Sequence, residues 1–335
     1  MPDGRVRLQD VADEAGLSKA AASYALRGLK SSPHTQQLVR DIADRLGYTA
    51  NPVAQALAGG RSGAVGVCGA LHDLWHQGLA VALAGRLRAA GHVSSIADTD
   101  GDPDRERALV ETMAREHVDG VVALVTDPEA RWWAELPEHF VVVSVGDVLT
   151  WRPQAPSVAF DNVAGVRTAL AHLAGLGHRR IGLLTTGLPS TPGRPAQRLA
   201  GLIAEERGLD LRLVSVPPVV GRSAGVIEDL LAGARRPTAV FCLSDSIAFA
   251  AYRAAARIGL DIPGELSVLG YDDHDLADLV DPALTTFGWD EDAIARTAID
   301  ALLSRWEDPP DDEPPARVVF RPHFVQRHST GDAAG

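Results

Sequence analysis

The chain has 335 residues, of which 46% are hydrophobic and 23% are charged, and its formal net charge is −12. This apolar content can form substantial cores, so the composition excludes wholesale disorder. No apolar run approaches the roughly 18 residues that a membrane-spanning helix needs, and the first ten residues are too polar for a secretory signal. We therefore expect a cytoplasmic protein without a membrane partner. Its two cysteines, Cys68 and Cys242, lie far apart and can form neither a disulfide framework nor a cysteine zinc site.

The charge is divided unevenly along the chain. Residues 1–62 hold eight Lys/Arg and six Asp/Glu, a balance of +2, so the remainder of a chain that carries −12 must carry −14. The overall acidity argues against non-specific binding of polyanions. A small, weakly basic head on an acidic body can still reach nucleic acid if its cations are well placed.

The first residues predict two short helices around a tight turn. Val11 and Ala12 fall on one face of the first helix, and Gly16 can end it. Ser18 can then cap a second helix over residues 20–26.

A third helix is predicted to begin at Ser32, which can serve as its N-cap with Pro33 at the first helical position. Gly47 can end this helix. Its apolar residues recur at spacings of four and are Leu38, Ile42 and Leu46. Three helices of this size are typical of a helix-turn-helix module.

Residues 51–62 (NPVAQALAGGRS) predict a linker with one or two helical turns, and from residue 63 β-rich runs alternate with helices. The strands are predicted at 64–70, 92–97, 119–125, 140–146, 179–186, 211–216, 237–243 and 265–271, and the helices at 78–91, 104–117, 162–177 and 245–259. This alternation predicts parallel sheets covered on both faces, in two α/β subdomains with a ligand-binding cleft between them. Residues 307–319 (EDPPDDEPPARVV) predict an acidic, Pro-rich loop.

Five segments together resemble the LacI/GalR family of bacterial transcriptional repressors, over essentially the whole chain. They are VRLQDVADEAGLSKAAASYALRG and LGYTANPVAQALAGGRS in the head and hinge, and PTAVFCLSDSIAFAAYRAA, LSVLGYDD and DPALTT in the core. The resemblance implies a small all-α helix-turn-helix head and an α/β periplasmic-binding-protein-like core of two doubly wound parallel-sheet subdomains.

The resemblance also implies a domain division and a function. The DNA-binding domain would span 1–50, the hinge helix and linker 51–62, and the effector-binding and dimerisation core 63–335. Within the core, the N-subdomain would take about 63–160 and 289–320, and the C-subdomain about 161–288. The expected function is a homodimeric repressor that binds double-stranded palindromic operator DNA under the control of a small polar effector. We expect no enzymatic activity, no cofactor and no metal, and the tail after Val325 lacks the heptad that a coiled-coil tetramer would need.

The second helix is the candidate reader of base edges, because a capped N-terminus can enter the major groove. The residues expected to contact DNA, by position or by resemblance, are Ser18, Lys19, Ala20, Ser23, Tyr24, Arg27, Asn51 and Leu57. The chain departs from the family where Arg7 replaces a capping Thr, which leaves that cap lost or replaced. The alternative is that the second helix has only a structural role, because any three-helix bundle needs a middle helix.

In the family, the segment that matches Pro52 to Ala58 folds on operator DNA and inserts a Leu, here Leu57, into the minor groove. A short helix is marginal alone, so this segment could order on DNA and fray on release. The alternative is an inert tether, which the Gly-rich end would equally suit.

The core positions that match effector contacts in the family are Asp161, Arg198 and Asp272, and Ser244 stands ahead of Asp245 where an Asn is common. A guanidinium and carboxylates would suit vicinal hydroxyls or a purine edge. Trp289 could stack on a sugar or be a core aromatic. Trp75 and His76 lie in HDLWHQG, which replaces the family's NPF-type segment, and are further candidates. Each Asp could instead be a helix cap or an ion-pair partner.

Parts of the sequence are also compatible with two other functions. A solute-binding protein would share the core but would need an export signal and no DNA head. A hydrolase could use Ser223 of GRSAG, with Asp272 and His323 as partners, if a strand came directly before it and a helix directly after. DTDGDPDRE resembles a calcium loop, but its Gly comes too early and Leu109 replaces the bidentate Glu.

Overall fold

The computed structural model describes residues 6–26, 30–48, 62–116, 118–186, 193–217, 220–307 and 316–333. The chain divides into two compact units, Met1–Ser62 and Gly63–Gly335. Each unit has a hydrophobic core of its own. Among the described residues, no helix combines the length and the apolar character needed to cross a membrane.

The first unit contains the helices α1 (Leu8–Glu14), α2 (Lys19–Leu26) and α3 (Pro33–Leu46). Their shared core consists of Val11, Ala12, Ala22, Ala25, Val39, Ile42 and Ala43. The Ser32 hydroxyl accepts a hydrogen bond from the Thr35 backbone N–H at 3.2 Å, and Gly47 closes α3 in the left-handed conformation with φ of 69°, as predicted. The predicted apolar face of α3 is wrong at Leu38, because that side chain is exposed and Val39 lies in the core instead.

The second unit begins with a six-stranded parallel sheet, in the order β11-β5-β4-β3-β1-β2. Its strands are β1 (Ala64–Gly69), β2 (Val93–Asp98), β3 (Gly120–Leu124), β4 (Val141–Gly146), β5 (Ser157–Phe160) and β11 (Arg317–Phe320). The helices around it are α5 (Leu74–Ala89), α6 (Pro103–Arg115), the 3-10 helix η1 (Arg131–Glu135) and α11 (Glu291–Glu307). We call this sheet with its helices the first subdomain.

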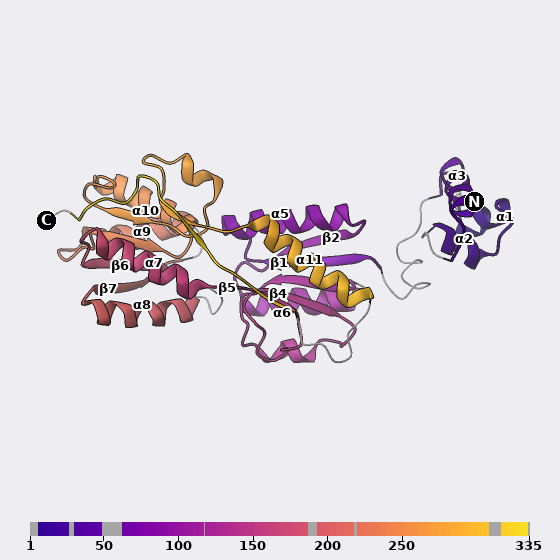
Figure 1. Cartoon of the computed structure of the whole chain (residues 1–335), viewed down its shortest axis with the longest axis horizontal. Helices are drawn as coiled ribbons and strands as arrows, with labels where there is room; N and C mark the ends of the chain where they lie inside the picture. Colours follow the sequence, from indigo (N-terminus) through magenta and orange to yellow (C-terminus); the bar gives the residue numbers. More distant parts are fainter. Residues whose placement is uncertain are drawn as a thin grey trace. The chain divides into compact units, whose positions relative to one another are not determined.

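Both faces of this sheet are covered, as the sequence predicts. Val122 and Leu124 pack with α5 and α11, whereas Val121 and Ala123 pack with α6 and η1, because side chains alternate along a strand. Figure 1 shows α5 and α11 side by side, and the two helices are in contact.

The second subdomain is built on a four-stranded parallel sheet in the order β7-β6-β8-β9. Its strands are β6 (Arg180–Thr185), β7 (Asp210–Ser215), β8 (Ala239–Cys242) and β9 (Ser267–Leu269), and β10 (Thr286–Gly288) pairs separately with β12 (His323–Val325) in antiparallel fashion. Its helices are α7 (Asn162–Gly175), α8 (Gly193–Arg207), α9 (Val220–Ala232), α10 (Asp245–Ile258) and the 3-10 helix η2 (Asp275–Asp278).

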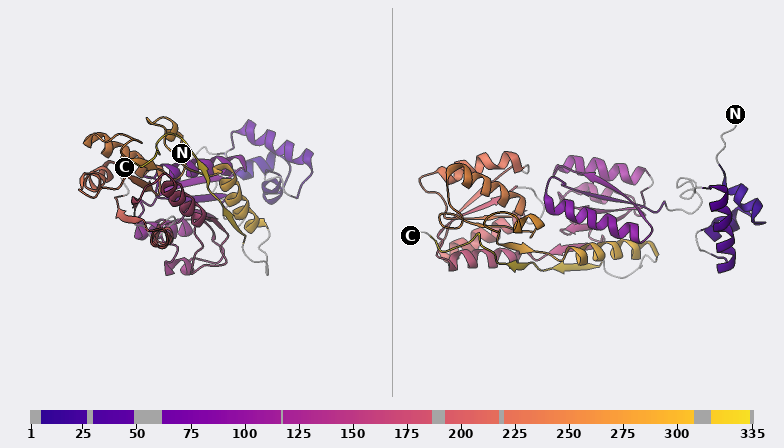
Figure 2. Two further views of the ribbon diagram at one scale, coloured as in Figure 1. Left: turned by 60° about the vertical axis from the view of Figure 1, so that its left-hand side comes forward. Right: turned by 90° about the horizontal axis from the view of Figure 1, so that it is seen from above.

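The chain passes between the two subdomains three times, after β5, after β10 and after β11. Figures 1 and 2 show the last passage, where the yellow C-terminal segment leaves the first sheet to join the second subdomain. Two of the passages are tied together, because the Asp161 backbone N–H donates to the Phe320 carbonyl at 2.8 Å. The passages place the residues around 161, 289 and 321 at the junction of the two subdomains.

The predicted strands all appear, but the acidic loop prediction needs correction at its end. Residues 317–319 of that predicted loop belong to β11, which pairs in parallel with β5 at the edge of the first sheet. Residues 308–315 of the loop lie outside the described residues. Cys68 and Cys242 are free and buried.

Candidate functional site

The N-terminus of α2 is capped and exposed, as the candidate reading helix requires. The Ser18 hydroxyl accepts a hydrogen bond from the Ala21 backbone N–H at 3.1 Å. Ser18, Lys19 and Ala20 are exposed, while Ala22 and Ala25 pack into the core of the head. The helix therefore presents one polar end to solvent and is held by its opposite face.

Further along α2, Ser23 and Tyr24 are half-buried. The Lys30 ammonium lies 5.3 Å from the centre of the Tyr24 ring, which places a second cation beside this helix. Both lysines of the chain, Lys19 and Lys30, are therefore in the head and next to α2. Arg27, Asn51 and Leu57 lie outside the described residues.

The lost cap of α1 is replaced from within the helix. Arg7 occupies the N-cap position, and an arginine side chain has no acceptor to offer. The Asp10 carboxylate instead accepts a hydrogen bond from the Arg7 backbone N–H at 2.7 Å. This is the reciprocal half of a capping box, so α1 keeps a defined start without a Thr.

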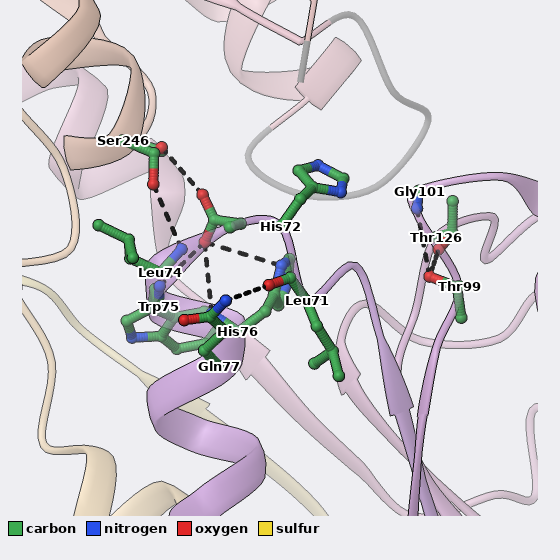
Figure 3. Close-up of polar contacts among 12 residues, drawn as sticks. Leu71, His72, Leu74, Trp75, His76, Gln77, Thr99, Gly101, Thr126 and Ser246 are labelled. Atoms are coloured by element: carbon green, nitrogen blue, oxygen red, sulfur yellow. Dashed lines mark hydrogen bonds and ion pairs between the residues drawn. The ribbon is translucent and has the colours of Figure 1, made fainter. Parts of the chain in front are cut away.

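In the second unit, two hydrogen bonds join the start of α5 to the start of α10. The Ser244 hydroxyl donates to Asp73 Oδ2 at 3.0 Å, and the Leu74 backbone N–H donates to the Ser246 hydroxyl at 3.3 Å. We call these four residues the junction latch. Figure 3 shows Leu74 facing Ser246, with Gln77 folded back to donate to the Leu71 carbonyl.

Asp73 also begins α5. Its Oδ1 accepts hydrogen bonds from the backbone N–H groups of Trp75 at 3.1 Å and His76 at 3.3 Å. One carboxylate therefore caps a helix of the first subdomain and binds a hydroxyl of the second. The sequence interpretation singled out Trp75 and His76 and missed Asp73 and Ser246. An Asp before an apolar helix is a capping signal, so the role of Asp73 at the start of α5 was predictable. Its bond to Ser244 was not, because the two residues are 171 positions apart and leave no local pattern.

Asp245, at the first position of α10, is buried and accepts hydrogen bonds from the Thr286 hydroxyl at 2.6 Å and the His274 backbone N–H at 2.9 Å. Burial raises the pKa of Asp245 to about 6, which these hydrogen bonds oppose. The structure thus gives Asp245 a bracing role between α10, β10 and the 272–275 segment.

Asp272 is half-buried just after β9, with a φ of 134° that an L-residue rarely adopts. Its backbone N–H donates to the Phe287 carbonyl at 2.7 Å. Burial of its carboxyl, together with the charges of Asp73, Asp245 and Glu291, raises the pKa of Asp272 well above the ordinary value. The fold therefore gathers several carboxyls at the junction.

Asp161 and Arg198 are placed differently. Asp161 caps α7 by accepting from the Ala164 N–H at 3.0 Å, and its other oxygen pairs with Arg321 at 3.2 Å. Arg198 is exposed on α8 and forms no ion pair with Asp161 or Asp272. The three residues expected to bind the effector together are not joined by direct contacts.

A chain of aromatic rings crosses the junction. Trp75 lies 5.4 Å from Phe160, Phe160 lies 4.7 Å from Trp289, and Trp289 lies 5.7 Å from Tyr271, between ring centres. Trp289 packs on the cores of both subdomains. The Tyr271 hydroxyl donates to Asn162 Oδ1 at 2.8 Å, which ties the start of α7 to the segment after β9 within the second subdomain.

Several polar atoms at this junction are buried without a hydrogen-bond partner among the described residues. They include Trp75 Nε1, His76 Nδ1 and Asn162 Nδ2. His76 Nδ1 lies 3.7 Å from Asp73 Oδ1, which is too long for a hydrogen bond. Burial lowers the pKa of His76 and the Asp73 charge opposes this, so the ring is a neutral group near pH 7.

The hydrolase interpretation is wrong. Ser223 lies within the first turns of α9, which begins at Val220 and not directly after β7, which ends at Ser215. The side chain is buried, and its hydroxyl donates to the Pro217 carbonyl at 2.7 Å. A nucleophile elbow would hold its serine exposed at a strand-to-helix turn. In the calcium-like run, Asp102 caps α6, and the described residues contain no cluster of metal-binding side chains.

Comparisons with known proteins agree with this architecture. Residues 170–330 match the family described as periplasmic binding protein-like domain. The HTH-type transcriptional regulator MalR of Streptomyces coelicolor is 31% identical over 342 residues, covering 98% of each chain. The ribose operon repressor of Haemophilus influenzae is 28% identical, covering 96% of this chain and 98% of its own length. A crystal structure of the lac repressor dimer bound to operator and the anti-inducer ONPF matches with a TM-score of 0.81 at 23% identity, covering 98% of this chain and 99% of that one.

The lac repressor match, at 23% identity, shows that the two chains share a fold. The MalR match, at 31% identity over 98% of each chain, shows that they share a family. MalR is named a transcriptional regulator and the Haemophilus influenzae protein a repressor, and both match over nearly their whole length. The chain belongs to the LacI/GalR family of HTH-type transcriptional regulators.

Proposed function

We propose that this chain is a sequence-specific transcriptional repressor that binds operator DNA through α2. The observation that carries the proposal is the capped, exposed start of α2, with Lys19 and Ala20 facing solvent while the opposite face packs into the head. Lys19 can donate to a guanine edge, and Ala20 can contact a thymine methyl. Backbone N–H groups at the helix start suit a phosphate.

The operator is expected to be palindromic, because two heads related by a dyad read two inverted half-sites. The domain limits that belong to this proposal are 1–50 for the reading head, 51–62 for the hinge and 63–335 for the effector-binding and dimerisation core. The N-subdomain takes about 63–160 and 289–320, and the C-subdomain about 161–288. The lac repressor structure, a dimer on its operator, is the precedent for this arrangement.

The effector is proposed to be a small polar molecule at the junction of the two subdomains. The candidate contacts are Trp75, His76, Asp161, Arg198, Ser244, Asp245, Asp272 and Trp289. Unpartnered donors beside aromatic faces support this location, because a polyol offers acceptors to the donors and an apolar face to the rings. A ligand that binds both subdomains changes the balance between closed and open junctions, with a coupling of about 1 to 3 kcal/mol to DNA binding.

The protein is proposed to act in the cytoplasm, where the chromosome is, without enzymatic turnover and without a cofactor. The hinge around Leu57 is proposed to order on DNA and to insert that Leu into the minor groove. Leu57→Ala should then weaken operator binding and blunt the response to ligand. Unchanged affinity and unchanged response would refute the wedge.

A competition binding experiment tests the main proposal. Bound fragments are selected from genomic DNA, and the recovered palindrome is compared with a scrambled duplex of equal composition at one salt concentration. Lys19→Ala should cost about 1 to 3 kcal/mol of operator binding. Arg88→Ala, which removes one exposed cation from the core, is the matched control and should bind as the parent does. Equal binding of palindrome and scramble by the parent would refute the proposal.

A further inference from the structure

Four carboxyls meet at the junction without a strong cation beside them. Asp73 precedes α5, Asp245 begins α10, Asp272 follows β9 and Glu291 begins α11. Hydrogen bonds hold these segments together, because the Asp245 backbone N–H donates to the carbonyl of Tyr271, next to Asp272, at 2.8 Å, and Asp73 accepts from Ser244, next to Asp245, at 3.0 Å. The charges of Asp73, Asp245 and Glu291 all act on Asp272. Among the described residues, no lysine or arginine forms an ion pair with any of the four.

Neighbouring carboxylates are treated differently by the fold. Asp161 pairs with Arg321 at 3.2 Å, Asp273 pairs with Arg327 at 2.7 Å, and Asp292 pairs with Arg86. Asp273 and Asp292 are the direct sequence neighbours of Asp272 and Glu291, and Asp161 lies where the chain crosses between the subdomains. The chain therefore pairs the flanking carboxylates with arginines and leaves the central four without a cation. A charged carboxylate that is partly removed from water and has no cation beside it lowers the stability of the fold.

Two buried side chains at the same junction are independently incomplete. Trp75 is 7% exposed and Asn162 is 8% exposed, yet Trp75 Nε1 and Asn162 Nδ2 have no hydrogen-bond partner among the described residues. Asn162 is joined to the acid set through Tyr271, whose hydroxyl donates to Asn162 Oδ1 at 2.8 Å. Tyr271 directly precedes Asp272. A buried donor without a protein partner leaves a hydrogen bond that a water or a ligand can complete.

The aromatic rings of Trp75, Phe160, Trp289 and Tyr271 supply the third element. Ring faces attract both the apolar face of a sugar and an adjacent cation. A neutral sugar would satisfy the donors and the rings but would leave the negative charge in place. A polyamine would pair with the carboxyls, but it has no oxygen to accept hydrogen bonds from Trp75 Nε1 and Asn162 Nδ2.

We propose that the effector of this junction is an amino sugar, a hexose that carries a free ammonium group. This inference rests on the proposed function and specifies the ligand class of its effector site. The ammonium pairs with Asp272 and Glu291, because both oxygens of Asp73 and both of Asp245 already accept hydrogen bonds within the protein. Asp73 and Asp245 add negative charge behind them. The hydroxyl oxygens accept from Trp75 Nε1 and Asn162 Nδ2, and the ring face lies on the aromatic side chains.

Calorimetry and thermal unfolding of the full chain with matched ligands test this inference. D-glucosamine and D-galactosamine are compared with D-glucose, D-galactose and the two N-acetyl forms, which keep the ring but lack the charge. Putrescine controls for general attraction of cations to an acidic protein. We expect at least one free amino sugar to bind about tenfold or more tightly than its neutral counterparts and than putrescine, the amount that one charged hydrogen bond contributes. Equal or tighter binding of the neutral sugars, or no binding of either amino sugar, would overturn the inference.

Two variants locate the charge that matters. Glu291→Gln and Asp272→Asn should each reduce the preference for the free amine over the N-acetyl form. Asp292→Asn, next to Glu291 but exposed and paired with Arg86, is the matched control and should keep the preference. If Asp272→Asn fails to fold, Glu291→Gln alone decides, and an unchanged preference in it refutes the assignment.

The outcome is separable from that of the proposed function. A chain that prefers its palindrome but ignores amino sugars keeps its function and loses this ligand class. A chain that binds an amino sugar but shows no DNA preference keeps the ligand class and loses the proposed function.

Discussion

The junction latch gives a prediction whose size follows from its geometry. Ser244→Ala removes one hydroxyl-to-carboxylate hydrogen bond of 3.0 Å. It does so without uncapping α10, because the Ser244 side chain makes no cap bond to that helix. A hydrogen bond to a charged group contributes about 1.5 to 3 kcal/mol, so the open junction should become roughly ten to a hundred times more populated.

Residue-resolved hydrogen exchange by NMR measures that opening directly. The Leu74 amide is protected by the Ser246 hydroxyl in the other subdomain, whereas the Trp75 and His76 amides are protected by Asp73 within their own helix. Ser244→Ala should speed exchange at Leu74 and leave Trp75 and His76 unchanged. Ser304→Ala, on an exposed position of α11, is the control.

Two results would refute this reasoning. Unchanged exchange at Leu74 in Ser244→Ala would mean that the bond contributes nothing to closure. Equal acceleration at Leu74, Trp75 and His76 would mean that the substitution frays α5 and does not separate the subdomains.

Three further predictions concern stability. Glu106 is fully buried, accepts from the Thr126 and Asp127 amides at 2.6 and 3.2 Å, and has a pKa raised by burial from 4.5 to about 7. The pKa of Glu106 is higher in the folded state than in the unfolded state. The protonated side chain therefore stabilises the fold fully below pH 4.5, and this contribution to the free energy of unfolding is lost as the pH rises through 7. In urea unfolding the parent should therefore lose about 3 kcal/mol over that range, and Glu106→Gln should not; parallel curves for both proteins would contradict this. Arg152 is buried and donates to the carbonyls of Trp133, Leu136, Pro137 and Phe140, so Arg152→Met should lower the free energy of unfolding by about 3 kcal/mol or more in the same assay, with Arg88→Met as the control. Ser18→Ala should cost the head about 1 kcal/mol through loss of the α2 cap, seen as faster amide exchange in α2 alone, and a global change or none would argue against a local cap.

The sequence predicted the parts of the fold that carry strong local signals. The Ser32 cap, Pro33 and the terminal Gly47 of α3 are local features, and all three serve as expected. The strands β5, β10, β11 and β12 have three or four residues each and were not predicted. The helix α11 was also missed, although Ile294, Ala298 and Leu302 repeat at spacings of four, so its signal was available.

Leu38 shows the limit of a pattern read by spacing alone. Leu38 and Val39 are adjacent apolar residues on α3, and either could have begun the buried stripe. The structure buries Val39 because it shares a face with Ile42 and Ala43, at spacings of three and four.

The junction residues were predictable only in part. Asp161, Ser244, Asp245, Asp272 and Trp289 were identified by resemblance, and the structure places all five at the junction. Asp73, Ser246 and Asn162 were not predicted, because each acquires its meaning from a partner far away in sequence. Such pairs form only in the tertiary fold, and neither local segment of sequence indicates them.

The threefold passage of the chain has a consequence for fragments of this protein. The residues that match the periplasmic binding protein-like domain, 170–330, include α11 and β11, which belong to the first subdomain, but omit β1 to β5. A polypeptide cut at those limits would carry a helix whose Ile294, Ala298 and Leu302 have lost their covering sheet, and would aggregate. The segment that homology recognises as a module is therefore not one that can be excised. A fragment that keeps the cores of both subdomains therefore has to begin near Gly63, where the second unit starts.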